Sequence, residues 1–166
     1  MKTFLSSKKI RWLMVLLWML LIFAMSHLDV AKSWVLTGHV MIAIEKNTVG
    51  NDIKTDEMSA FEEMNYYNQN EMCMILLRKA AHVFEFFGLS LSLVYAFSLN
   101  NTLRFTNIKT MAFGLVYASF DEAHQLLIVG RTGNVRDVGI DMIGVMLGIL
   151  VAYIVVKRLG RLNYEN

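Results

Sequence analysis

Apolar residues in this chain gather into four long runs that are separated by more polar connections. We predict membrane-spanning helices at about residues 10–26, 72–99, 108–129 and 138–156. A helix of about 20 apolar residues crosses the hydrocarbon core of a bilayer, and the run at 72–99 is long enough to tilt or to project beyond it. The pattern therefore predicts an all-α, polytopic membrane helix bundle with four transmembrane spans.

The composition agrees with a membrane class. The 166 residues are 55% hydrophobic and 18% charged, and the mean hydropathy is +0.44. Soluble domains carry about 25% charged residues, so the lipid bilayer is the expected surrounding. A net charge of +2 gives no indication of a nucleic-acid partner.

Charged residues outside the runs predict the orientation. The N-terminus, the 100–109 connection and the C-terminus are basic, whereas residues 27–71 hold eight acids and three lysines. Basic segments stay in the cytoplasm, so we predict cytoplasmic N- and C-termini and an acidic extracytoplasmic loop at 27–71. Within that loop the apolar stretch 34–44 is too short to span. No small-residue cleavage site follows the first run, so we expect an uncleaved anchor.

Ionisable residues interrupt one end of three runs. Arg78, His82 and Glu85 are spaced i, i+4, i+7 and share one face of a helix, with Lys79 beside them. The third run contains Asp121, Glu122, His124 and Gln125, and the last begins near Arg131, Arg136, Asp137 and Asp141. Under the predicted topology all of these lie toward the outer leaflet. Charges at membrane depth normally face a protein interior or a watery cavity, so we predict one polar pocket that opens outward.

The last run carries a stripe of small and acidic residues on one helix face. Asp137, Asp141, Gly144 and Gly148 follow one another at intervals of four, three and four residues. Glycines at i, i+4 let a neighbouring backbone approach closely in a membrane. Buried carboxylates need partners, and we expect Arg78 or Arg131 to pair with the two aspartates.

Four roles for the pocket remain open on this pattern. These roles are a structural hydrogen-bond network, an anion-binding site, an acid–base catalytic site, and a metal site built from the pairs His82/Glu85 and Asp121/His124. The catalytic candidates are His82, Glu85, Asp121 and His124. The substrate-binding candidates are Arg78, Lys79, Glu122, Gln125, Arg131, Arg136, Asp137 and Asp141. The pattern alone assigns no metal ligand and no cofactor.

The order of these motifs resembles the VanZ-like family over about residues 10–156. The resemblance rests on Arg78-Lys79-x-x-His82-x-x-Glu85, then Asp121-Glu122-x-His124-Gln125, then Gly130-Arg131 and the Asp137 to Gly148 stripe. It implies a multi-pass protein of the bacterial cytoplasmic membrane with a role at the cell envelope, including resistance to the glycopeptide teicoplanin. The expected function is to bind or modify an outer-leaflet component, a lipid-linked envelope precursor or a glycopeptide. The alternative is a membrane enzyme that acts on a lipid-linked precursor by His/carboxylate acid–base or metal chemistry.

Overall fold

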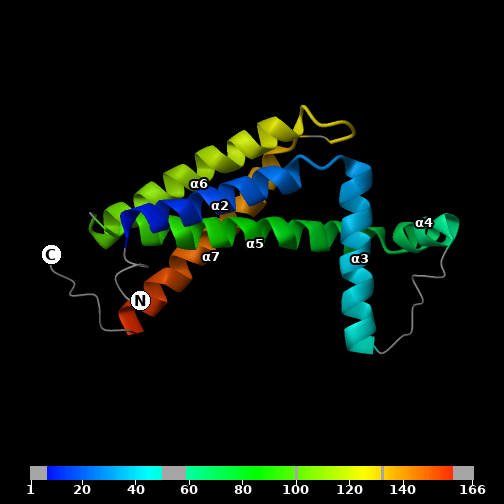
Figure 1. Ribbon diagram of the computed structural model, residues 1–166, viewed down its shortest axis with the longest axis horizontal. Coiled ribbons are helices and arrows are strands. Elements are labelled where there is room, and N and C mark those ends of the chain that lie inside the picture. Colours follow the sequence, from blue (N-terminus) through cyan, green and yellow to red (C-terminus); the bar gives the residue numbers. More distant parts are fainter. Residues whose placement is uncertain (1–6, 50–58, 100, 132, 159–166) are drawn as a thin grey trace.

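The computed structural model describes residues 7–49, 59–99, 101–131 and 133–158. All regular structure in these residues is helical (Figure 1). The helices are α2 (Lys8–Ser26), α3 (Val30–Val49), α4 (Ala60–Gln69), α5 (Glu71–Phe97), α6 (Leu103–Gln125) and α7 (Val135–Arg158). The all-α prediction is therefore confirmed.

Helix α5 is the centre of the fold. It contacts every other described helix. Helices α2, α5 and α6 run side by side, α7 crosses α5, and α3 lies across the start of α5 and not along the bundle (Figure 1). The start of α2 and the end of α7 lie at the same end of this bundle, and the α6–α7 connection lies at the opposite end.

Three described helices are long and apolar enough to cross a membrane: α2, α5 and α7. Helix α6 is 23 residues long and belongs to the same bundle. It does not qualify by composition, because it carries Arg104, Lys109 and the acids near its end.

The apolar surface of the bundle faces outward. On α2, Val15, Ile22 and Ser26 are buried, whereas five leucines on the other faces of the helix are about half exposed (Leu13, Leu16, Leu17, Leu20 and Leu21). Helix α7 is similar, with Ile143, Met146, Leu147 and Leu150 exposed. A helix that is hydrophobic all round is typical of a membrane span.

The glycine stripe brings α7 onto the backbone of α5, as the sequence predicted. A methyl group at Gly144 would collide with the Val83 carbonyl oxygen, and one at Gly148 would lie 2.8 Å from the Phe87 carbonyl oxygen. The Ser90 hydroxyl donates to the Val145 carbonyl across the same contact, at 2.8 Å. Close approach and polar contacts of this kind drive helix association in lipid.

Two further polar contacts attach α2 to the bundle. The Tyr117 hydroxyl donates to the Met19 carbonyl at 2.6 Å. At the other end, the Arg11 guanidinium donates to the Tyr95 carbonyl at 2.7 Å and lies over the Tyr95 ring. The position of α2 is thus fixed at both its start and its second half.

The segment predicted as an acidic loop contains two helices. Helix α3 has 20 residues, whereas the apolar stretch alone suggested about eleven, because polar residues on both sides continue the helix. Helix α4 starts with a capping box formed by Ser59 and Glu62, which stabilises helix starts. The Tyr66 hydroxyl donates to the Glu45 carboxylate at 2.5 Å. Burial and that carboxylate raise the pKa of Tyr66 to about 12, so the phenol keeps its proton.

Candidate functional site

Three helices bring one histidine and two aspartates together. His82 on α5, Asp121 on α6 and Asp141 on α7 each place one nitrogen or oxygen within 4.8 Å of the others. His82 Nδ1 lies 3.7 Å from Asp141 Oδ1 and 3.9 Å from Glu85 Oε2. Residues far apart in sequence thus form one cluster, which we call the carboxylate–histidine cluster (His82, Glu85, Asp121 and Asp141).

The cluster lies inside the bundle, near one end. Asp121 is four residues before the end of α6, and Asp141 is six residues after the start of α7. At 1.5 Å per residue these positions are about 6–9 Å below the helix ends. Asp121 and Asp141 are each only 2% exposed, so the cluster is shielded from the surroundings.

Asp121 is held by a hydrogen-bond network that crosses three segments. Its Oδ2 accepts from the Ser26 hydroxyl at the end of α2 and from Gln125 Nε2 one turn later on α6, both at 2.9 Å. Gln125 Oε1 in turn accepts from Arg131 Nη1 at 3.0 Å. The carboxylate therefore has a fixed orientation.

Arg131 joins the α6–α7 connection to the end of α2. Its Nε donates to the Leu28 carbonyl at 3.0 Å, and Nη2 donates to the Met25 carbonyl at 3.4 Å. Gly130 has a φ of +77°, a conformation that glycine adopts readily, and this turn precedes Arg131. Burial and the nearby Arg78 guanidinium lower the pKa of Arg131, so two cations face the same region.

A polar cavity of about 30 Å³ adjoins the cluster. It is large enough for one or two water molecules or an ion. Its polar lining comes from α5, α6 and α7 (Arg78, Lys79, His82, Glu122, Gln125, Asp137 and Asp141). At its mouth, Lys79 Nζ pairs with Asp137 Oδ1 at 3.2 Å, and both side chains are more than one-third exposed.

The predicted pairing of the aspartates with arginines is wrong. Asp137 pairs with Lys79, and Asp141 lies against His82. Arg131 instead binds carbonyl oxygens and Gln125, because its position in the connection faces the end of α2. The sequence shows which residues share a helix face but not the rotation of one helix against the next.

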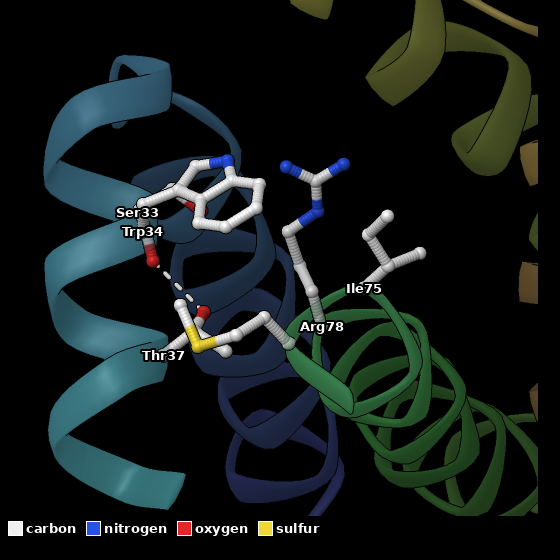
Figure 2. A pocket seen from close by; sticks show the side chains of 6 residues that line it. Ser33, Trp34, Thr37, Ile75 and Arg78 are labelled. Atoms are coloured by element: carbon white, nitrogen blue, oxygen red, sulfur yellow. Dashed lines mark hydrogen bonds between the residues drawn. The ribbon is translucent and has the colours of Figure 1, made fainter. Parts of the chain in front are cut away.

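Arg78 is left without an acidic partner among the residues that the structure describes. It lines both the polar cavity and a small hollow against α3. Figure 2 shows its side chain extending from α5 beside the indole ring of Trp34. No hydrogen bond or ion pair with a described residue holds the guanidinium. The half-buried cation is therefore available to a ligand.

A protein-family model described as VanZ/LLP1 matches residues 11–156. The chain belongs to the VanZ/LLP1 family. With its three apolar helices, it is a VanZ-like membrane protein. Comparison with curated proteins found no match, and comparison with solved structures found none.

His124, Glu122 and Arg136 of this VanZ/LLP1 member were predicted as site residues and lie outside the cluster. His124 packs against Phe23 and His27, with ring centroids 4.5 and 5.4 Å away. The Glu122 carboxylate accepts from the backbone N–H of Asn134 at the start of α7. The Arg136 side chain is exposed. The pair Asp121/His124 therefore does not face His82 as one unit.

Two site residues of this family member were missed by the sequence reasoning. Ser26 orients Asp121, and Trp34 flanks Arg78. A buried serine at the end of an otherwise apolar run was a usable signal for the first, because polar side chains in a membrane helix need partners. Nothing in the sequence pointed to Trp34, since its place depends on the angle between α3 and α5.

Proposed function

We propose that this VanZ-like membrane protein binds an envelope component with an anionic head group at the outer leaflet. The observation that carries the proposal is Arg78, a half-buried guanidinium that lines the cavity and has no partner among the described residues. Arginine matches phosphate and carboxylate groups by paired hydrogen bonds. The family and the site suit a lipid-linked precursor or a glycopeptide, and reduced susceptibility to teicoplanin follows if such a component is bound or modified.

The charge distribution across the cavity supports an anion at its mouth. Arg78 and Lys79 lie at the more exposed side, and Arg131 is half-buried nearby. The carboxylates of Glu85, Asp121 and Asp141 lie deeper. An anionic head group at the mouth would contact the cations first, while its lipid chains remained among the exposed apolar residues of the bundle.

We further propose that α6 is the fourth span of a multi-pass protein in the bacterial cytoplasmic membrane. Its 23 residues reach about 35 Å at 1.5 Å per residue, enough for the bilayer core of about 30 Å. It packs along α2, α5 and α7, and Leu115, Val116 and Phe120 are exposed on its outer face. With four antiparallel spans and the basic termini, both chain ends are cytoplasmic.

This orientation predicts the labelling of Cys73, the only cysteine in the sequence. Cys73 is exposed and lies nine residues before His82 on α5, about 13 Å further toward the start of that helix. It should therefore project outside the membrane. In intact spheroplasts, a membrane-impermeant maleimide is expected to label Cys73 without permeabilisation.

The matched control for this labelling is Cys73→Ser combined with Arg104→Cys. Arg104 is exposed near the start of α6, at the opposite end of the bundle (Figure 1). The new thiol should react only after permeabilisation. Labelling of Cys73 only after permeabilisation, and of the thiol at position 104 without it, would show that the orientation is the reverse and that the cavity faces the cytoplasm.

The binding proposal predicts a large effect of Arg78→Gln. Purified protein in detergent should bind polyprenyl phosphate, measured by native mass spectrometry or microscale thermophoresis. Hydrogen bonds to charged groups contribute about 1.5–3 kcal/mol, which corresponds to about a 10- to 150-fold weaker affinity in the variant. Because the guanidinium has no partner within the described part of the chain, the thermal stability should change little.

Arg104→Gln is the matched control, since it removes the same charge at the far end of the bundle. Its affinity should equal that of the wild type. If Arg78→Gln bound polyprenyl phosphate as tightly as the wild type does, the binding proposal would be contradicted. In cells, a deletion strain should become more susceptible to teicoplanin, and Arg78→Gln should not restore the wild-type level; unchanged susceptibility of the deletion strain would remove the resistance part alone.

The second candidate function is a membrane enzyme acting on a lipid-linked precursor. It is favoured by one observation: buried His82 Nδ1 has no hydrogen-bond partner among the described residues and lies within 4 Å of two carboxylates. A general base needs such an available nitrogen, and its contacts often tighten only with substrate bound. Envelope lipid profiles of a His82→Gln strain separate the two functions, because only an enzyme variant accumulates its substrate.

A further inference from the structure

The carboxylate–histidine cluster has the ligand types and spacing of a cation site. One nitrogen of His82 and one oxygen each of Asp121 and Asp141 lie within 4.8 Å of one another. Ligand bonds of about 2.0–2.2 Å place neighbouring ligand atoms about 3–4 Å apart. Small side-chain rotations would therefore close the three atoms around one ion, and the adjoining cavity has the room for it.

Glu85 gives a second and independent indication of a ligand. Its side chain is more than nine-tenths buried, with a residue exposure of 7%. Its Oε2 has no hydrogen-bond partner among the described residues and lies 3.9 Å from His82 Nδ1, which also has none. Buried polar atoms almost always have a partner, and exceptions require an explanation such as a bound water or ion.

The surroundings of Asp121 resemble the outer contacts of metal ligands. Ser26 and Gln125 both donate to Oδ2, and Arg131 holds Gln125. Hydrogen bonds of this kind orient carboxylate ligands and leave the other oxygen for the ion. A network whose only role was structural would also give hydrogen bonds to Glu85 Oε2 and His82 Nδ1, and among the described residues they receive none.

We propose that His82, Asp121 and Asp141 bind one divalent transition-metal ion, with Glu85 as the fourth ligand. One imidazole with carboxylates suits Zn²⁺, Mn²⁺ or Fe²⁺. The ion would compensate three buried carboxylates that share a single imidazole and form no ion pair with a lysine or arginine among the described residues. The site goes beyond the proposed function and does not depend on it, because Arg78 lies at the cavity mouth and is not a ligand.

The test uses the full chain, purified in detergent and stripped with a chelator. After equilibrium dialysis against ZnCl₂ or MnCl₂, elemental analysis should find one ion per chain. Asp121→Asn and Asp141→Asn should each bind at least tenfold more weakly. The control is Glu45→Gln, which removes a carboxylate on α3 that accepts a hydrogen bond from Tyr66. This variant should bind the metal ion as tightly as the wild type does. Lipid binding is measured separately, so failure of one proposal does not imply failure of the other.

A spectroscopic variant covers the case in which the asparagine variants fail to fold. In a Cys73→Ser background, His82→Cys loaded with Co²⁺ should show a thiolate-to-cobalt charge-transfer band, and the Cys73→Ser protein alone should lack it. A folded wild-type protein that retains neither Zn²⁺ nor Mn²⁺ would overturn the proposal. So would the absence of the band in a folded His82→Cys variant.

Discussion

Gly144→Leu is expected to separate α7 from α5 and to destabilise the folded protein by at least about 3 kcal/mol, the upper part of the range for overpacking. At Gly144 even a methyl group would meet the Val83 carbonyl oxygen and lie 3.0 Å from the Phe87 backbone nitrogen. Backbone atoms of a helix cannot move aside as side chains do, so the helices must part. The loss of stability is measured by unfolding the protein in mixed micelles with increasing sodium dodecyl sulfate.

The matched control on the same helix is Gly139→Ala. A methyl group there meets nothing within 4 Å, so this variant should be as stable as the wild type or gain up to about 1 kcal/mol from helix propensity. The cluster depends on the same contact, because Asp141 is three residues from Gly144. A Gly144→Leu protein with wild-type stability would show that α7 does not approach α5 closely.

Arg131→Ala is expected to cost about 3 kcal/mol of unfolding free energy, since hydrogen bonds of a charged donor contribute about 1.5–3 kcal/mol each. The variant leaves the Leu28 carbonyl and the Gln125 amide oxygen without their donor. It also removes a positive charge from the region of Asp121 and Glu85. Thermal unfolding of the purified protein measures the effect.

Two comparisons make the Arg131 result specific. Arg136→Ala removes the same charge from an exposed position in the first turn of α7 and should change stability by no more than about 0.5 kcal/mol. The stability of Arg131→Lys should lie between those of Arg131→Ala and the wild type. An ammonium group keeps the charge but lacks the forked geometry that reaches both the Leu28 carbonyl and the Gln125 amide oxygen. If Arg131→Ala and Arg136→Ala proved equally mild, the contacts from Arg131 to α2 would not contribute to stability.

The apolar runs determined much of the fold without any knowledge of contacts. Runs of about 20 apolar residues specify helices wherever water is excluded, because every backbone group must then be bonded within its own segment. The same sequence predicted the glycine contact of α7, since Gly144 and Gly148 share a helix face whatever the partner. The sequence did not predict the length of α3, because polar residues at both ends of the apolar stretch are compatible with a helix or a loop.

The residues of the candidate site likewise separate into features that the sequence determined and features that only the tertiary structure determined. Spacing along one helix is a local property, so the sequence by itself placed Arg78, His82 and Glu85 on one face and predicted that ionisable residues of three runs form one polar pocket. Rotation and depth of one helix against another are set by packing. Only the tertiary structure therefore decided that Asp141 rather than His124 joins His82 and Asp121, that Lys79 pairs with Asp137, and that Arg78 has no acidic partner among the described residues.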